Sequence, residues 1–260
     1  MLQPRLATNR WLQLSAIGAI GFLAVWTSAA LSGLTSRDFL PTPWDVLQRF
    51  MHLVREPFSG ATLGMHLLSS LQRFGMGFGL AALVGVPLGL LMARFRWLDR
   101  LVTPAFEAVR FVAPIAWVPF AALWFGTGIG GPVLIIVMGA FPPVLINTYR
   151  GARQVDLKYI EAAQMLGASH WRAMTQVMLP ATVPSIVAGL RISAGLGWQS
   201  LVGAELIVAS SGVGYLMVKG QAAISTATVM SGMLAIGVVG VIIDAALRRV
   251  QLTIETRRGL

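Results

Sequence analysis

The chain has 260 residues, of which 56% are hydrophobic and 12% are charged, and its net charge at pH 7 is +10. A soluble domain carries about twice this charged share, and several windows approach the roughly 20 apolar residues that cross a bilayer. The composition therefore indicates a membrane protein. The sequence has no cysteine, which excludes disulfides, thiol catalysis and cysteine-ligated metals.

The hydropathy pattern predicts an all-α membrane protein with about six transmembrane helices. Glycine and proline are frequent inside them, as membrane helices tolerate. The small residues at 27–30 would suit signal-peptide cleavage, but the first apolar stretch is long, and we expect it to be retained. The predicted spans are 12–34, 66–92, 111–125, 132–148, 183–209 and 226–247. They leave a head at 1–11, an outer loop at 35–65, a five-helix core at 66–247 and a tail at 248–260.

The positive charges predict the orientation in the membrane, because lysine and arginine gather on cytoplasmic loops. With the amino end inside, thirteen lysines and arginines fall on inner segments and four on outer segments. Both termini are therefore expected in the cytoplasm. We interpret the charge as orientation and lipid headgroup contact, with no nucleic-acid partner. The inner set is Arg5, Arg10, Arg94, Arg96, Arg100, Arg150, Arg153, Lys158, Arg172, Arg248, Arg249, Arg257 and Arg258, and the outer set is Arg37, Arg49, Arg55 and Lys219.

The outer loop contains a second kind of helix signal. Pro41 and Pro43 set an extended entry, and Asp45 suits the amino end of a helix. Apolar residues then recur at helical spacing, which predicts a short helix lying in the outer interface. These residues are Trp44, Leu47, Phe50, Met51 and Val54.

The longest inner loop carries an amphipathic segment with a built-in break. Residues 159–180 contain EAAQMLGASHWRAMTQVMLP, in which Glu161 lies near a helix start and Gly167 breaks the helix. A second helix at 169–178, capped by Ser169, is expected to follow. Pro180 and Pro184 should then mark the return into the membrane. Such an elbow can fill a groove on another protein, or it can pack only on its own bundle.

At these residues the sequence resembles the permeases of ABC importers. The matching signature is Glu161-Ala162-Ala163, Gly167, Val177 and Leu179-Pro180, where valine replaces the commoner isoleucine. FLPTPWDVL, the run PIAWVPFAALWFGTG and the run GLRISAGLGWQSLVGAELI are similar to the nitrate, sulfonate, taurine and bicarbonate branch. The likeness covers about 39–247 and implies the ABC importer permease fold.

The resemblance implies a mechanism and partners. The elbow would be the coupling helix that docks on an ATPase subunit, and the residues it assigns to coupling are Glu161, Ala162, Ala163, Leu166, Gly167, Ala168, Leu179 and Pro180. Two copies of the chain would assemble with two ATPase subunits, which hold ATP and Mg²⁺, and with an extracytoplasmic binding protein. The location would be the bacterial inner membrane. Nitrate, taurine, alkanesulfonate and bicarbonate all stay open as the imported solute, as does a less expected small organic anion or heterocycle.

Polar and aromatic residues inside the spans are candidates for the substrate path, because ionisable groups there are costly. This tentative set is Arg73, Trp117, Trp124, Trp198, Gln199, Ser200 and Glu205. For Arg73 a snorkelling position at the headgroups is the alternative, and for Glu205 it is pairing with an arginine. A second set is expected to form structural ion pairs: Glu107 with Arg110, Asp244 with Arg248, and Arg191 with a partner not specified.

Two other function classes fit less well. The chain lacks the G-x-x-x-x-G-K-[ST] phosphate loop, so it is not expected to be an enzyme, and ATP hydrolysis would take place in another polypeptide. A membrane-embedded enzyme would need convergent catalytic groups at membrane depth, and only His52, His66 and His170 are present. An ion-coupled secondary transporter or channel would need an ion site and usually an internal repeat, and neither is visible.

Overall fold

The computed structural model describes residues 4–33, 36 and 38–257, and it gives the backbone alone for 4–12 and 257. Arg37 and Arg258 therefore lie outside the described residues, as do the side chains of Arg5, Arg10 and Arg257 and the outermost parts of the predicted head and tail. The described residues are helical and contain no strand. They form two compact units, residues 1–64 with 216–234 and residues 65–215 with 235–260, and the division falls inside three helices.

The first unit contains α1 (Pro4–Leu31) and α2 (Pro43–Arg55), followed by parts of α3, α10 and α11. A capping box starts α2: the Thr42 hydroxyl accepts from the Asp45 backbone, and the Asp45 carboxylate accepts from the Thr42 backbone. The helix predicted in the outer loop is thus confirmed. Val46 and Leu53 are buried, whereas Trp44, Leu47, Met51 and Val54 are exposed. An interfacial position for this exposed apolar face stays a prediction.

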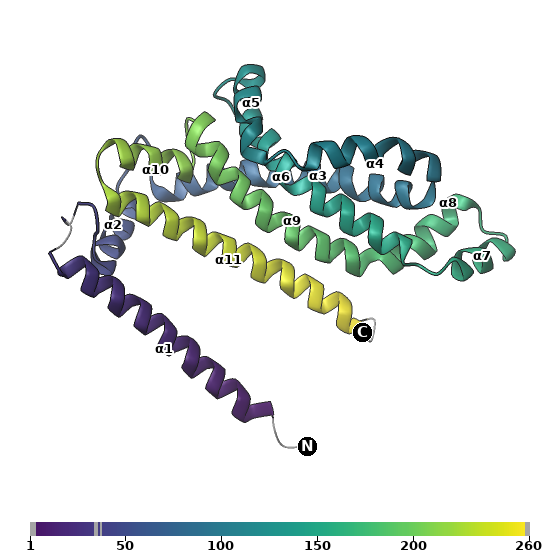
Figure 1. Ribbon diagram of the computed structural model, residues 1–260, viewed down its shortest axis with the longest axis horizontal. Coiled ribbons are helices and arrows are strands. Elements are labelled where there is room, and N and C mark those ends of the chain that lie inside the picture. Colours follow the sequence, from purple (N-terminus) through teal and green to yellow (C-terminus); the bar gives the residue numbers. More distant parts are fainter. Residues whose placement is uncertain (1–3, 34–35, 37, 258–260) are drawn as a thin grey trace. The chain divides into compact units, whose positions relative to one another are not determined.

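The second unit holds the larger bundle, and Figure 1 shows its long helices with the short α7 and α8 at one end. It contains most of α3 (Leu63–Arg94), all of α4 (Arg96–Arg110), η1 (Pro114–Trp117), α5 (Val118–Phe125), α6 (Gly130–Arg153), α7 (Leu157–Met165), α8 (His170–Ala173), η2 (Met174–Met178) and α9 (Leu179–Val208), the start of α10 (Val213–Ala222) and the later part of α11 (Thr226–Arg257).

Glycines bring three of these helices close together. A Cβ atom at Gly77 of α3 would lie 2.7 Å from Ile136 of α6, and one at Gly89 would lie 2.9 Å from Thr148. A Cβ at Gly189 of α9 would lie 2.7 Å from Asn147. Small residues at helix contacts let the backbones approach, as is common in membrane bundles. However, a Cβ at Gly75 or Gly79 would meet nothing within 4 Å, so the glycine stripe of α3 is only partly a packing surface.

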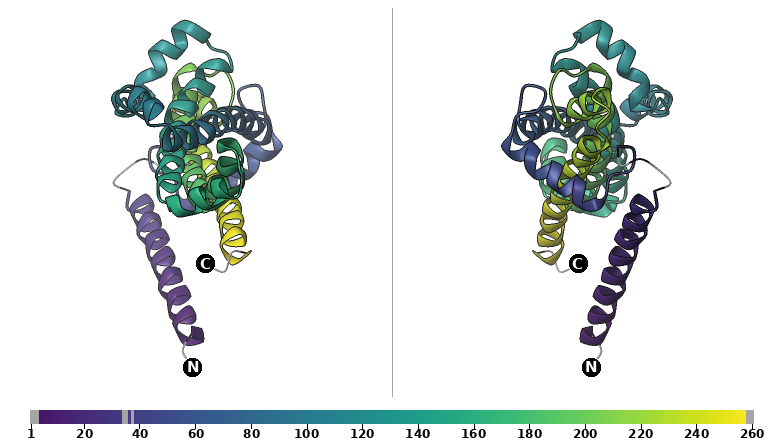
Figure 2. Two further views of the ribbon diagram at one scale, coloured as in Figure 1. Left: turned by 90° about the vertical axis from the view of Figure 1, so that its right-hand side faces the viewer. Right: turned by 90° about the vertical axis from the view of Figure 1, so that its left-hand side faces the viewer.

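In the part of the chain that the structure describes, five helices are long and apolar enough to cross a membrane, or six if one bent pair counts as a single span. The third span, predicted at 111–125, corresponds to this bent pair: α4 and the η1–α5 segment, which meet at an angle of 91°, so the pair begins at Arg96 and is not one continuous helix. Figure 2 shows the helices around this bend at the top of both views, and α5 still packs Val118 and Ala121 against α6 and α9. Pro114 explains the break, since a proline forces the residue before it out of the helical region, and Ala113 has a ψ of 138°.

The inner elbow also differs from its prediction. The second elbow helix is not separate from the fifth span, because α8, η2 and α9 form one apolar helical segment, His170–Val208, that runs through Pro180 and Pro184. The π-helical turn η2 lies just before Pro180. We attribute the continuity to this turn, because wider hydrogen-bond spacing accommodates a ring that would clash with the preceding turn. The sequence analysis also missed α4 and α10.

Candidate functional site

The elbow begins with a side-chain cap at Asp156. Its carboxylate accepts from the Lys158 backbone at 3.1 Å and lies 2.7 Å from the Lys158 ammonium. The hydrogen bond from the Lys158 side chain, and then the one from its backbone, hold the pKa of Asp156 below its ordinary value. Asp156 is therefore ionised at neutral pH and caps α7, and the cap is lost only when the pH falls through this lowered pKa.

The first arm of the elbow ends in a Schellman motif. The Gly167 N–H donates to the Gln164 carbonyl at 2.9 Å, and the Ala168 N–H donates to the Ala163 carbonyl at 3.0 Å. Gly167 has a φ of +86°, a left-handed conformation that side chains with a Cβ rarely adopt. Ser169 then caps α8 by accepting from the Arg172 backbone. The glycine of the signature thus sets the angle between the two arms.

A buried apolar cluster fixes the elbow to the bundle. Ile160 of α7 and Met174 and Met178 of η2 pack with Leu90 of α3 and Ala152 of α6, and Ala163 and Leu179 border them. Burial of such side chains stabilises by about 1.5–3 kcal/mol each. The elbow therefore belongs to the rigid part of this unit.

The tip of the elbow, in contrast, exposes apolar side chains. Met165 is 87% exposed and Leu166 is 90% exposed, and Ala162 is exposed beside them. Of the predicted coupling residues, Glu161 and Gly167 are also exposed, whereas Ala163, Ala168, Leu179 and Pro180 are half-buried. Contiguous exposed apolar side chains are typical of interaction sites. The tip is therefore a candidate interaction surface.

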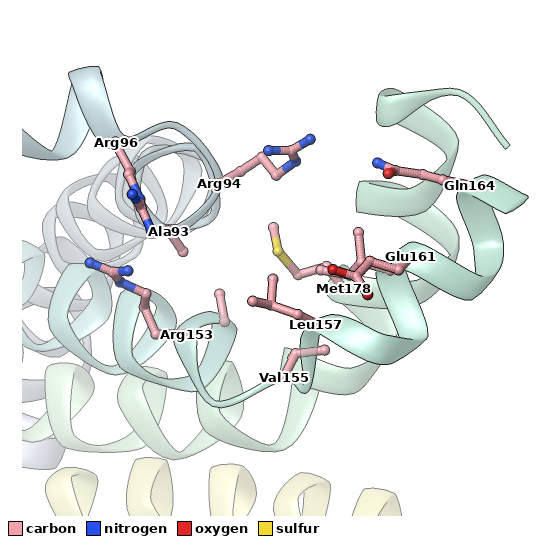
Figure 3. Close-up of a pocket in the computed structure, with 11 residues that line it drawn as sticks. Ala93, Arg94, Arg96, Arg153, Val155, Leu157, Glu161, Gln164 and Met178 are labelled. Carbon is pink, nitrogen blue, oxygen red and sulfur yellow. The ribbon is translucent and has the colours of Figure 1, made fainter.

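A basic cavity of about 330 Å³ lies behind the tip, lined in part by Arg94, Arg96, Arg153, Glu161 and Gln164. Figure 3 shows Arg94 and Gln164 on opposite sides of it. The Arg94 guanidinium and the Gln164 amide each lie 2.8 Å from Nδ1 of His170. Polar contacts thus connect the end of α3 with both arms of the elbow.

Arg73 and Glu205 form a buried ion pair. The Arg73 Nη1 atom donates to Glu205 at 2.9 Å, and the side chains are 6% and 1% exposed. The expectation that Arg73 snorkels to headgroups was wrong, because the carboxylate of α9 pairs it inside the protein. Glu205 also accepts from the Ser70 hydroxyl at 2.8 Å and from the Gly214 N–H at 3.0 Å. Arg73 further donates to the carbonyl and hydroxyl of Ser211, both at 2.6 Å.

This network holds the turn between α9 and α10. The Val213 N–H donates to the Ser70 hydroxyl at 3.0 Å, and a Cβ at Gly214 would lie 2.6 Å from Glu205. The sequence analysis missed the contribution of Ser70, Ser211 and Gly214. The run SSGVG was a possible signal, because glycine allows a close backbone approach. Arg73 and Glu205 thus neutralise each other's charge, although the buried Nε atom of Arg73 has no hydrogen-bond partner among the described residues.

The aromatic and amide candidates of α9 and α5 face different surroundings. Trp198 is buried and donates to the Ile236 carbonyl of α11 at 3.1 Å, so it does not lie beside Gln199 and Ser200 on the predicted path. Successive helical residues point about 100° apart, which separates them. Gln199 and Ser200, unlike Trp198, line a cavity between α6 and α9. Trp124 is exposed. Trp117 borders an apolar cavity, and its buried indole N–H has no hydrogen-bond partner among the described residues.

The predicted ionic pairs are partly rearranged. Glu107 accepts from Arg110 Nε at 2.7 Å, as the three-residue spacing predicted. Asp244, however, pairs with Arg191, through Nε at 2.7 Å and Nη2 at 3.1 Å, and not with Arg248. A fork from a neighbouring helix satisfies both carboxylate oxygens, which explains its preference over a contact within one helix.

The chain was compared with families and with known proteins. Residues 85–259 match the family described as binding-protein-dependent transport system inner membrane component. The chain is 35% identical to the taurine transport system permease protein TauC of Escherichia coli, over 96% of this chain and 91% of that one. It is 36% identical to the putative aliphatic sulfonates transport permease protein SsuC of Bacillus subtilis, over 87% and 80%.

A solved structure supports the fold independently. An inward-facing structure of the MetNI methionine ABC transporter contains a chain that matches with a TM-score of 0.64 and 17% identity, over 74% of this chain and 95% of that one. This similarity shows the fold, whereas the family match and the sequence identity to TauC and SsuC show which family the chain belongs to. The chain therefore belongs to the family of binding-protein-dependent transport system inner membrane components.

Proposed function

We propose that the chain is the membrane permease of an ATP-driven importer for a small anion. The observation that carries the proposal is the elbow, whose apolar tip at Met165 and Leu166 is exposed although its base is anchored in the bundle. An apolar tip on a rigid base can transmit movement from a partner that covers it. The relatives named for taurine and for aliphatic sulfonates support an anionic substrate.

The assembly we propose contains two copies of this chain, two ATPase subunits and an extracytoplasmic binding protein in the bacterial inner membrane. ATP and Mg²⁺ are held by the ATPase subunits. Both termini lie in the cytoplasm, as does the elbow. Closure of the ATPase pair on ATP moves the docked elbows and opens the path toward the binding protein, and hydrolysis returns the path to the inward-facing state.

Two elbow variants test this function. Gly167→Arg places a side chain at a φ of +86°, and Glu161→Lys reverses a charge beside the tip. Both should abolish the stimulation of ATP hydrolysis by the loaded binding protein, and uptake with it, whereas the permease should still be recovered from membranes in normal amount. Trp97→Gln, an exposed position on α4, serves as the control. Normal uptake by both elbow variants would reject the docking role.

A further inference from the structure

Three cavities of the larger unit share one residue, Arg110. The first, the Gln199 cavity, measures about 380 Å³ and lies between α6 and α9, with Gln199, Ser200 and Gly203 among its lining residues. The second, the Arg150 cavity, measures about 120 Å³ and includes Tyr149 and Arg150 at the end of α6. The third is the apolar cavity of about 360 Å³ beside Trp117. Arg110 thus stands where the middle of the bundle meets its elbow end.

The position of Arg110 is set by the broken span. It is the last residue of α4, immediately before the 91° bend. Irregular backbone at membrane depth occurs where it is buried in protein or lines a cavity. An ionisable residue at such a place is a functional candidate in its own right. The Gln199 cavity lies against the middle of α6, at Met138 to Pro143.

The hydrogen bonding of Arg110 leaves donors free. Its Nε atom donates to Glu107 at 2.7 Å, and its guanidinium lies 4.7 Å from the centre of the Phe111 ring. Among the described residues its two terminal nitrogens make no hydrogen bond, and its side chain is 30% exposed. A guanidinium held through Nε presents the remaining N–H groups as a fork that matches an oxyanion.

The other polar groups of the Gln199 cavity complement that fork. The Gln199 amide is exposed and has no partner among the described residues, so it adds a second donor. Ser200 already donates to the Leu196 carbonyl at 2.7 Å. Glu107, the carboxylate paired with Arg110, lines the neighbouring Arg150 cavity and offsets the charge of Arg110 from there. A balanced charge keeps an anion weakly held, which transport requires, because a tightly bound solute is not released.

We propose that Arg110 forms an anion-binding site on the substrate path. Its terminal nitrogens, with the Gln199 amide, hold the oxyanion group of the solute in the Gln199 cavity and pass it toward Arg150. The ligand class is a small sulfonate, nitrate or carbonate-type anion. This inference rests on the proposed function, since it assigns residues to the path of that importer. It also gives Arg110 a role beyond the ion pair with Glu107.

The test uses the permease with its ATPase subunits and binding protein in liposomes. Taurine, methanesulfonate, nitrate and bicarbonate serve as probes, and both uptake and ATP hydrolysis are measured. Arg110→Gln should lower the anion taken up per ATP hydrolysed by about tenfold, the loss expected for a charge-assisted hydrogen bond. Stimulated hydrolysis should stay within about twofold of the wild type, because the elbow is intact. Arg100→Gln, an exposed arginine of the same helix, should leave both unchanged.

A conservative variant keeps the test decisive if Arg110→Gln fails to assemble. Arg110→Lys retains the ion pair with Glu107 but loses the planar fork, so uptake per ATP should fall while assembly is preserved. A wild-type ratio in this variant, or an equal fall of uptake and hydrolysis, would overturn the inference alone. If the wild-type complex imports none of the four anions, the proposed anion importer itself is rejected, and the role of Arg110 with it.

Discussion

At the residue scale, the elbow depends on two side chains that face away from the bundle. Met165 and Leu166 are the most exposed large apolar residues of this segment. Their neighbours Ala163 and Ile160 point into the cluster that anchors the elbow. One turn of helix thus separates the face that anchors the elbow from the exposed face that we propose docks on the ATPase subunit, and single substitutions should affect one without the other.

Leu166→Glu should weaken the association of the permease with its ATPase subunits. Truncating a central apolar residue of an interface costs about 2 kcal/mol or more, which corresponds to roughly a thirtyfold change in Kd. Co-purification and titration of the separated subunits would measure it. Lys158→Gln, at the opposite end of the same helix, is the matched control and should change the Kd less than about twofold. Equal affinities for Leu166→Glu and wild type would contradict a docking tip.

The left-handed residue of the elbow gives a second prediction. Gly167→Ala should loosen the junction by about 1 kcal/mol, because a Cβ is unfavourable at a φ of +86° although no atom lies within 4 Å of it. Hydrogen exchange at the Gly167 and Ala168 amides would report the change as faster exchange. Gly167→Asn should exchange more slowly than the alanine variant, since asparagine tolerates this conformation better. Unaltered protection in both would show that the Schellman motif does not form.

The buried pair Arg73–Glu205 gives a third prediction. Removing one partner, as in Arg73→Met or Glu205→Leu, should destabilise the protein by about 3–5 kcal/mol, because it leaves an uncompensated buried charge. The double variant should lose clearly less stability than the two single variants lose in sum. Thermal unfolding of the purified protein in detergent would give the four values of the cycle. Additive losses would mean that the two charges do not interact.

At the scale of elements, glycines decide how closely α3 approaches α6. Gly77→Ala should destabilise by about 1–3 kcal/mol, because the new Cβ would lie 2.7 Å from the Cβ of Ile136. Gly79→Ala is the matched control on the same helix: its Cβ would meet nothing within 4 Å, and alanine favours helix by about 1 kcal/mol. Unfolding temperatures should therefore move in opposite directions. A shift of the same sign in both would argue against close α3–α6 packing.

Helix boundaries show where local patterns suffice and where they do not. The start of α2 follows from Thr42 and Asp45, whose reciprocal hydrogen bonds are local. Pro114 lies inside the span predicted at 111–125, and the helix breaks just before it. At Pro180, by contrast, the helix continues, because η2 widens just before it and the anchoring cluster holds Met174 and Met178 in place. A proline inside a helix therefore raises the free energy of the helical conformation, and tertiary packing decides whether the helix bends, widens or stops.

At the scale of the whole molecule, the distribution of arginines predicts the topology. A fluorescent protein fused after Leu260 should fluoresce, since it folds on the cytoplasmic side. Alkaline phosphatase inserted at Gly60 should be active, because this loop is expected on the outer side of the membrane, where the enzyme folds. Thirteen inner against four outer positive residues provide the physical reason. The reverse pattern would also place the elbow on the wrong side for any ATPase.

The sequence by itself determined the apolar helices, the amphipathic helix of the outer loop, the glycine break of the elbow and the resemblance to ABC importer permeases. These features depend on short-range periodicity, on local caps and on a signature within about twenty residues. Only the tertiary structure decided which charges meet: Arg73 with Glu205, and Arg191 with Asp244, each join two helices distant in the chain. It also placed Arg110 and Gln199 at the lining of one cavity. Such pairs depend on how each helix is rotated and how far it is shifted along its axis relative to its neighbour. Glycine contacts and helix bends set both together, so no single segment of the sequence encodes an ion pair between two helices.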